Sequence, residues 1–240
     1  MRVFTDKIWS PVPAAQQRVV LAVLLIEAGR VVTSDRLIHE IWGDSRPRAA
    51  NAVIRGYVMR LRRRLGPQGD RALVTRDTGW ELIVDRDDVD TGSFDDSVAA
   101  GRRALARGDL AGAEDLLSQA LGHWRGSALE DVPRAPTVVA FASLLEQVRL
   151  MVAEERIGVR LALGRHTDVL GELQQLLKDH PLNERLWADL MVALCRAGRR
   201  AEALTAFQRA RQALITELDL EPGERLVDLR QAILSNRPLS

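Results

Sequence analysis

The chain has 240 residues, 46% of them hydrophobic, which is enough for one large domain or two smaller ones with their own cores, and we expect two. Its single cysteine, Cys195, excludes an intrachain disulfide and a thiolate metal cluster and favours a reducing compartment. No apolar run approaches the roughly 20 residues of a membrane helix, and the N-terminus lacks the layout of a signal peptide, so we expect a cytoplasmic protein without membrane contact.

The formal net charge of +1 hides an uneven distribution of charge along the chain. Residues 1–84 contain 14 lysines and arginines against 8 acidic residues, a balance of +6. Residues 85–240 contain 20 against 25, a balance of −5. This segregation predicts that the first part meets a polyanion and the second does not, with an accidental asymmetry as the alternative.

Two helices are predicted in the first part of the chain, after a short extended start. Residues 14–28 place apolar side chains at helical spacing and stop at Gly29. The stretch TSDRLIHEIWG predicts a second helix that is capped by Thr33 or Ser34 and closed at Gly43.

A third helix is predicted from about residue 48 to residue 65, and its outer face is basic. The residues expected to be buried are Ala50, Ile54, Tyr57, Val58, Leu61 and Leu65. The residues expected on the opposite face or its flanks are Ala52, Arg55, Gly56, Met59, Arg60, Arg62 and Arg63. Small residues between arginines would let this face approach the major groove of DNA, where arginine reads guanine or binds phosphate. A solvated basic face is the alternative.

Residues 72–84, ALVTRDTGWELIV, predict two strands joined around Asp77, Thr78 and Gly79, with Arg76 at the tip. Three helices followed by a hairpin are the layout of a winged helix-turn-helix. In that fold the third helix enters the major groove, and the wing touches the adjacent backbone or minor groove.

The stretch DRDDVDTGS then joins the two parts of the chain. Its carboxylates have no partner ligands nearby, so a solvated linker is expected rather than a metal site. Ser93 and Asp96 resemble a capping box that starts the next helix. We therefore divide the chain into a DNA-binding domain over 1–84, a linker over 85–93 and a helical-repeat domain over 94–240.

Three stretches of the second part each contain an aliphatic residue, a glycine and then an amphipathic helix. The glycines are Gly108, Gly164 and Gly198, and the last two are 34 residues apart, the period of a tetratricopeptide repeat. The first two are 56 residues apart, which leaves room for an inserted segment around GSALEDVPRAP. The predicted fold class is therefore mainly α, a winged helix-turn-helix followed by a tetratricopeptide-like domain whose concave surface would bind protein segments.

No catalytic, cofactor or metal site is predicted. The four histidines are scattered without a catalytic or ligand spacing, and neither a nucleophile elbow nor a nucleotide-binding motif occurs. We therefore do not expect an enzyme.

Six stretches carry a resemblance to a known family: LAVLLIEAGRVVTSDRLIHEIWGD, VIRGYVMRLRRRLG, LVTRDTGWELIV, ALGHWRGSALEDV, LALGRHTDVLGELQQLLKDHPLNERLWADLMVALCRAGRRAEAL and ELDLEPGERL. In this order, and covering nearly the entire chain, they resemble the Streptomyces antibiotic regulatory proteins, which join an OmpR-type winged helix to a bacterial transcriptional activation domain. The resemblance implies an activator of a secondary-metabolite gene cluster that binds direct repeats near the −35 promoter element.

The resemblance also implies partners and binding residues. The partners are double-stranded promoter DNA, the RNA polymerase holoenzyme through its sigma factor and alpha or beta subunits, and a second protomer beside the first on the DNA. By motif position, the residues nearest DNA would be Arg48, Asn51, Arg55, Met59, Arg60, Arg62 and Arg63 in the third helix, with Arg76 and Thr78 in the wing.

Two expectations separate these arginines by role. Arg55 should reach a base edge, whereas Arg62 and Arg63, about two turns later, should lie beside phosphates. The alternative function is a helical-repeat adaptor whose basic helix contacts acidic protein partners. Equal affinity for cognate and scrambled DNA would favour that alternative.

Overall fold

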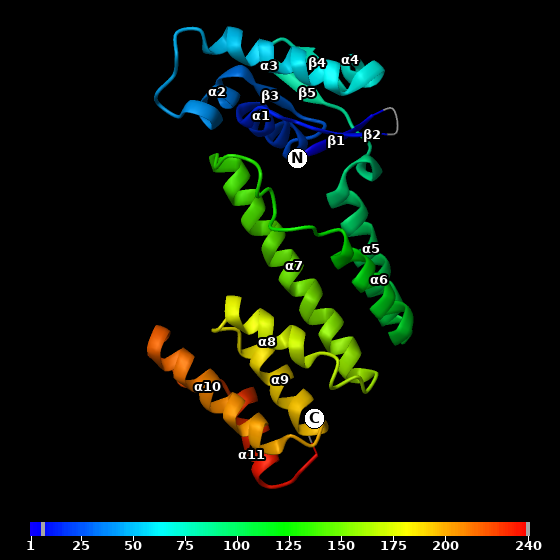
Figure 1. Ribbon diagram of the computed structural model, residues 1–240, viewed down its shortest axis with the longest axis vertical. Helices are drawn as coiled ribbons and strands as arrows, with labels where there is room; N and C mark the ends of the chain where they lie inside the picture. The colour runs from blue at the N-terminus through cyan, green and yellow to red at the C-terminus, as the bar shows by residue number, and fades with distance from the viewer. Residues whose placement is uncertain (6–7, 239–240) are drawn as a thin grey trace. The chain divides into compact units, whose positions relative to one another are not determined.

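The computed structural model describes residues 1–5 and 8–238, and these residues form two compact units (Figure 1). The first unit contains residues 1–96 together with residues 122–150. The second contains residues 97–121 and the chain from residue 151 onward. The mainly helical fold class is confirmed, with a winged helix-turn-helix in the first unit and helical repeats in the second.

The predicted helices of the first unit are present. They are α1 (Ala15–Ile26), α2 (Ser34–Trp42) and α3 (Ala50–Arg64). Thr33 caps α2, because its hydroxyl accepts a hydrogen bond of 3.2 Å from the backbone N–H of Arg36. Helix α3 begins two residues later than its sequence pattern predicts.

Two small antiparallel sheets complete the winged helix. Strands β1 (Arg2–Thr5) and β2 (Ile8–Pro11) pair with each other. The second sheet has the order β3-β5-β4 and contains β3 (Val31–Thr33), β4 (Leu73–Arg76) and β5 (Gly79–Leu82). The wing hairpin of β4 and β5 is thus confirmed. Strand β5 also pairs with β3, the strand that leads into α2.

Short helices connect these parts. They are η1 (Gly66–Gln68) and α4 (Gly69–Ala72), between α3 and the wing, and η2 (Arg86–Asp88), after the wing.

Strand β5 requires glycine at its first position. A Cβ atom on Gly79 would lie 2.0 Å from the carbonyl oxygen of Val32 on β3, which is closer than any side chain allows. The next contact along the same edge is a hydrogen bond of 3.1 Å from the backbone N–H of Ser34 to the carbonyl of Thr78. The wing tip is therefore attached to the start of α2 by backbone contacts.

The segment between α6 and α7 packs on the winged helix. Its buried residues Val132, Ala135 and Val138 belong to the same apolar cluster as the cores of α1, α2 and α3. Arg18 of α1 also donates from Nε to the carbonyl oxygen of Asp131 at 2.5 Å. The core of the first unit is therefore completed by residues that lie far along the chain.

A buried carboxylate attaches α2 to the start of α7 (Pro136–Ala162). Glu40 is 8% exposed and accepts a hydrogen bond of 3.0 Å from the backbone N–H of Thr137, in the first turn of α7, and a second from the Thr137 hydroxyl. An anion at this position satisfies an otherwise unpaired helix N–H group and interacts favourably with the helix dipole.

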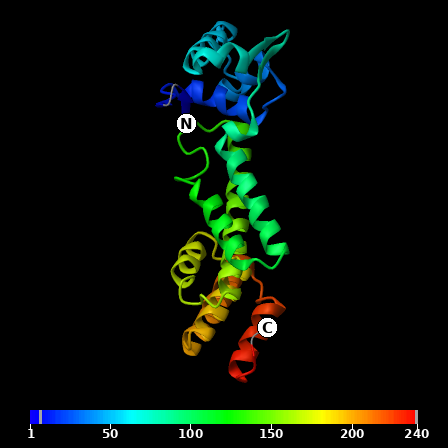
Figure 2. The same ribbon diagram turned by 90° about the vertical axis from the view of Figure 1, so that its right-hand side faces the viewer.

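Six further helices of the described residues follow, and the first of them, α5, begins within the predicted linker. They are α5 (Asp90–Ala106), α6 (Leu110–Gly122), α8 (Leu170–Asp179), α9 (Glu184–Arg196), α10 (Arg200–Leu218) and α11 (Glu224–Leu234). The prediction that Ser93 starts α5 is wrong, because its backbone N–H already donates to the carbonyl of Val89 within the first turn. Helix α9 packs against α8, α10 and α11, and α10 also packs against α11. The C-terminal helix α11, coloured red, is seen separately from the helices before it in Figure 2.

The three predicted repeat glycines occupy the same kind of turn. Gly108, Gly164 and Gly198 have φ angles of 77°, 77° and 78° and follow α5, α7 and α9. In each turn the N–H of the glycine donates to the carbonyl oxygen of the residue three positions before it. The N–H of the residue after the glycine donates to the carbonyl oxygen five positions before that residue. This is the Schellman arrangement, in which glycine adopts the left-handed conformation without steric cost. The repeat pattern read from the sequence is therefore confirmed as three helix–turn–helix units with the same glycine turn, although α8 begins six residues after its glycine and α6 and α10 begin two residues after theirs.

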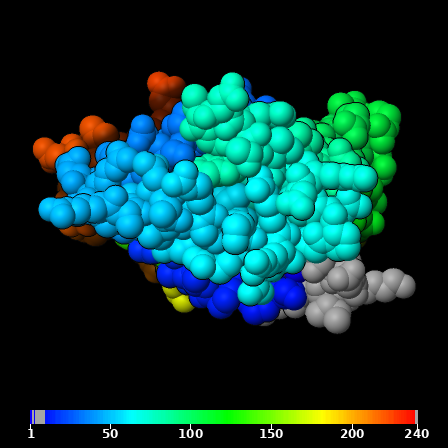
Figure 3. Space-filling view, turned by 90° about the horizontal axis from the view of Figure 1, so that it is seen from above, coloured from blue at the N-terminus to red at the C-terminus, as the bar shows by residue number. Residues whose placement is uncertain are grey.

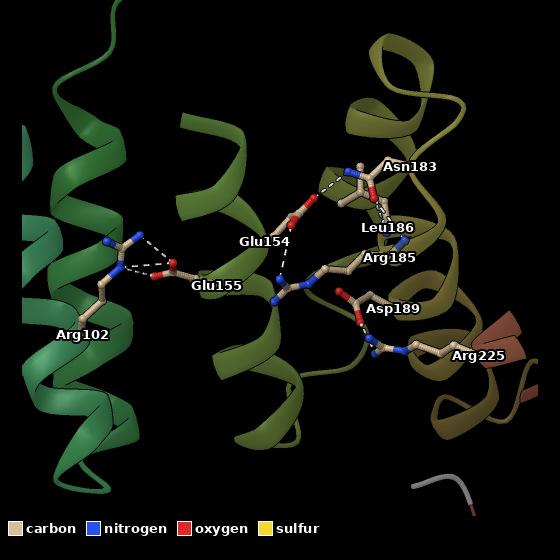
Figure 4. Close-up of polar contacts among 8 residues, drawn as sticks. All are labelled: Arg102, Glu154, Glu155, Asn183, Arg185, Leu186, Asp189 and Arg225. Atoms are coloured by element: carbon tan, nitrogen blue, oxygen red, sulfur yellow. Dashed lines mark hydrogen bonds and ion pairs between the residues drawn. The ribbon is translucent and has the colours of Figure 1, made fainter. Parts of the chain in front are cut away.

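Polar contacts between helices stabilise the second unit (Figure 4). Arg102 of α5 donates from both Nε and Nη2 to the carboxylate of Glu155 of α7, and the shortest contact is 2.7 Å. Next to it, Glu154 accepts a hydrogen bond of 2.6 Å from the side chain of Asn183, which also caps α9. Charged groups thus connect α5, α7 and α9 at successive positions along α7.

Two buried carboxylates of this unit have opposite pKa shifts. Glu114 of α6 accepts from Arg160 at 2.8 Å and also binds Arg165, and the hydrogen bond from Arg160 lowers its pKa. Asp189 of α9 is 6% exposed, its Arg225 partner lies 3.5 Å away, and burial raises its pKa. The charged form is therefore favoured at Glu114 and disfavoured at Asp189.

The sequence predicts no segment long and apolar enough to cross a membrane, and α7 is an exception to this prediction. It is the one helix of the described residues that is long and apolar enough to do so by length and composition. One such helix does not establish a membrane span, because helices of soluble proteins pass the same test, and 17% of the apolar stretch of α7 is buried.

Replacing Glu40 by alanine should lower the free energy of unfolding by about 2 kcal/mol, because two hydrogen bonds to a buried charge are lost. Glu40→Gln keeps an acceptor but loses the charge at the helix end, so we expect a loss of about 1 kcal/mol. Asp35→Ala is the control, since this carboxylate of α2 is 82% exposed in its pair with Arg46. Chemical denaturation measures all three, and equal midpoints for Glu40→Ala and Asp35→Ala would contradict the role given to Glu40.

Glu114→Gln and Asp189→Asn should change the free energy of unfolding in opposite directions, relative to the original chain, as the pH rises from acid to neutral. The folded-state pKa of Glu114 is lowered, so the stability it contributes is present at neutral pH and is lost as the pH falls below about 4.5. Glu114→Gln should cost about 3 kcal/mol at pH 7 and less in acid. The folded-state pKa of Asp189 is raised, so Asp189→Asn should gain stability relative to the original chain as the pH rises from about 4. Denaturation curves between acidic and neutral pH measure both, and parallel curves for either variant would refute its assignment.

Candidate nucleic-acid interface

Helix α3 presents a ridge of exposed side chains at four-residue spacing. The ridge residues are Asn51, Arg55, Met59 and Arg63, and all four are exposed. Each follows by one or two positions a residue of the buried stripe, so the ridge lies away from the core. The buried residues of α3 are Ala50, Ile54, Val58 and Leu61.

The surface around the ridge is strongly basic and unobstructed within its own unit. Helix α3 contains five arginines and no acidic residue. In the space-filling view, the residues from α3 to the wing, coloured cyan, form one continuous face (Figure 3). This face combines an exposed helix with a hairpin beside it, as the sequence pattern predicts.

Three of the predicted contact residues are available for a ligand. Arg48, Arg55 and Arg63 are exposed, and no hydrogen bond or ion pair involves their side chains within the part of the chain that the structure describes. A basic side chain without an internal partner can bind an anion without first breaking an ion pair.

Arg60 lies across the small-residue part of the helix. Its guanidinium carbon is 5.2 Å from the ring centroid of Tyr57, a cation–π contact. The same group lies 3.7 Å from where a Cβ atom of Gly56 would be. The gap expected at Gly56 is therefore covered by a flexible side chain, which has to move before another surface can approach the glycine.

Arg62, which is expected to lie beside a phosphate, makes hydrogen bonds within the protein in this structure. Its Nε donates to the carbonyl oxygen of Leu73 at 2.7 Å, and its Nη2 donates to the hydroxyl of Thr75, also at 2.7 Å. Its side chain is only 22% exposed, and Asp70 lies 3.6 Å away. These contacts attach the C-terminal part of α3 to strand β4 of the wing.

Backbone packing makes the same connection tight. A Cβ atom on Gly69, at the start of α4, would lie 2.0 Å from the carbonyl oxygen of Arg62. Arg64, two residues after Arg62 on α3, donates to the carbonyl oxygen of Pro11 on β2 at 2.6 Å. The last turn of α3 is thus held on one side by the wing and on the other by the N-terminal hairpin.

The two wing residues differ in freedom. Arg76 is paired with Glu81 on the neighbouring strand, with a shortest contact of 2.6 Å, yet it stays 45% exposed. Thr78 is exposed at the tip, and its carbonyl oxygen accepts the hydrogen bond from Ser34. The wing therefore presents a hydroxyl and a partly neutralised arginine on a backbone that is held in place.

Two family models match the chain. One, described as the bacterial transcriptional activator domain, matches residues 89–234. The other, described as the C-terminal part of transcriptional regulatory proteins, matches residues 13–82 and so covers the helix-turn-helix and wing.

Individual relatives agree with these matches. The chain is 38% identical to the regulatory protein DnrI of Streptomyces peucetius over 234 residues, which cover 94% of this chain and 86% of that protein. It is 39% identical to the regulatory protein AfsR of Streptomyces griseus over 219 residues, which cover 91% of this chain but 22% of that protein. A solved structure of Mycobacterium tuberculosis EmbR in complex with a low affinity phosphopeptide has a TM-score of 0.91 at 33% identity and covers 98% of this chain and 63% of that one.

Arg62→Ala should lower the free energy of unfolding by about 2 kcal/mol, because two hydrogen bonds from a charged group are lost. Arg63→Ala, the neighbouring control, should change it by less than about 0.5 kcal/mol, since its side chain is exposed. Denaturation of the two variants under the same conditions measures the difference. Indistinguishable curves would mean that Arg62 does not hold the wing.

Proposed function

We propose that this chain, which belongs to the Streptomyces antibiotic regulatory protein family of transcriptional regulators, is a sequence-specific DNA-binding activator of a secondary-metabolite gene cluster. It would bind direct repeats near the −35 promoter element and recruit the RNA polymerase holoenzyme through its sigma factor and alpha or beta subunits. We propose that two protomers bind side by side on the DNA, in the cytoplasm and without a cofactor. Members of such a regulator family are not enzymes.

One observation supports DNA binding most directly, namely the exposed ridge of α3 with arginines that have no internal partner. The major groove is about 12 Å wide, which matches an α-helix with its side chains. Arg48, two residues before α3, and Arg63, near the end of the helix, could then bind phosphates on either side of the groove. Between them, Asn51 and Arg55 have the chemistry that reads adenine and guanine.

The remaining predicted contacts take supporting roles in this proposal. Arg60 would leave Tyr57 and bind the DNA backbone, while Arg76 and Thr78 of the wing would contact the backbone beside the groove. We propose that Arg62 acts indirectly, because its contacts to Leu73 and Thr75 set the position of the wing relative to α3.

The domain boundaries remain part of the proposal. Residues 1–84 would bind DNA, residues 85–93 would link, and residues 94–240, with a net charge of −5 together with the linker, would contact polymerase or the neighbouring protomer. Residues 129–138 pack on the winged helix, so we expect the isolated first domain to be less stable than the same residues in the full chain. Tests of DNA binding should use the full chain, because the isolated first domain would lack part of its core.

Selection of tight-binding duplexes from a random pool with the full chain should yield a repeated motif. The selected duplex should bind at least 1,000-fold more tightly than its scrambled version at physiological salt. Arg55→Ala should cost about 1 to 3 kcal/mol on the selected duplex and little on scrambled DNA. Arg63→Ala should weaken both and reduce the salt slope by about one.

These measurements also separate the adaptor alternative. If the selected and scrambled duplexes bind equally, the basic helix has no sequence readout and an acidic protein partner is favoured instead. Melting curves of both variants control for loss of fold.

A further inference from the structure

Met59 is out of place on the ridge of α3. Its side chain is 53% exposed, and it is the one large hydrophobic residue of this helix that the structure leaves exposed. Its ridge neighbours are Arg55, one turn before, and Arg63, one turn after, while Val58 beside it in the chain is fully buried. Met59 therefore stabilises neither the core of the winged helix nor the basic character of the face.

Phosphate binding does not account for an apolar side chain at this position. Thioether and methylene groups offer no donor to an anion, so Met59 adds nothing to the electrostatic attraction of the face. The major groove does contain one apolar group, the C5 methyl of thymine, and apolar side chains are used to contact it. Methionine is unbranched and adaptable, so it can reach a methyl group at a range of positions.

The surrounding side chains leave Met59 accessible. Arg60, the next residue, folds over Tyr57 and Gly56 instead of lying along the ridge. Helix α3 contains no acidic residue that could form an ion pair with Arg55 or Arg63. The ridge thus offers one apolar contact flanked at both sides by cations that can hold the helix against the DNA.

We propose that Met59 is a specificity-determining residue that contacts the C5 methyl group of a thymine in the major groove. This inference rests on the proposed DNA-binding function and adds one base of its recognition sequence. Four residues of an α-helix span about 6 Å, which corresponds to roughly two base-pair steps of 3.4 Å. The thymine therefore lies within about two base pairs of the guanine contacted by Arg55.

The test replaces single thymines by deoxyuridine, which lacks only the methyl group. In the duplex selected with the full chain, each thymine is replaced in turn and the affinity is measured. One replacement close to the Arg55-dependent guanine should weaken binding by the original chain about fourfold, the value of one buried methyl group. Met59→Ala should bind the thymine duplex more weakly by a similar factor and should no longer respond to that replacement.

Two further variants make the result specific. Met59→Gln keeps the length of the side chain but is polar, so it should also lose the response to deoxyuridine. Met151→Ala removes a methionine of similar exposure, 48% exposed on α7, and should keep the full response of the original chain. Melting curves establish that each variant is folded before its affinity is compared.

The outcomes are distinguishable. If the original chain and Met59→Ala respond identically to every replacement, or if the selected motif has no thymine within two base pairs of that guanine, Met59 does not read a thymine methyl. If no duplex is bound in preference to scrambled DNA, the proposed function itself fails, and Met59 with it.

Discussion

The winged helix depends on a buried carboxyl group that comes from its own second helix and is hydrogen-bonded by a helix from beyond the predicted first domain. Glu40 is nearly inaccessible to water, and its side chain is satisfied by the first turn of α7, where the backbone N–H and the hydroxyl of Thr137 both donate to it. Val132, Ala135 and Val138, which lie close to this contact in the chain, belong to the same buried cluster as the apolar residues of α1, α2 and α3. Together with the hydrogen bond from Arg18 to the carbonyl of Asp131, this contact holds the segment that completes the core.

The same fold uses some arginines of α3 to hold the helix in place and leaves others without an internal partner among the described residues. Arg62 and Arg64 are used inside the unit, where they hold the wing and the N-terminal hairpin against the last turn of the helix. Arg55 and Arg63 have no such partner within the described residues. Neighbouring residues of one type thus differ in role because successive positions on a helix point in directions about 100° apart, so only some of them can reach the strands.

The second unit shows what a repeat pattern in a sequence can and cannot specify. The glycines at 108, 164 and 198 predict equivalent turns, and the turns are equivalent because the left-handed conformation selects glycine at that one position. The partners of Glu114, Glu154 and Asp189 are not part of the pattern. They arise from packing between helices that are many residues apart in the chain, and the opposite pKa shifts of Glu114 and Asp189 follow from those partners.

The sequence by itself determined the mainly helical class, the three helices and hairpin of the winged helix, the basic outer face of α3 and the repeat turns. These are local properties, set by apolar spacing, capping residues and glycine conformations over a few residues. Only the tertiary structure decided that Arg62 bonds to Leu73 and Thr75, that Arg60 covers Gly56, and that the inserted segment supplies part of the first core. Each of these depends on contacts between residues distant in the chain or on the direction of one flexible side chain, and neither leaves a periodic signal in the sequence.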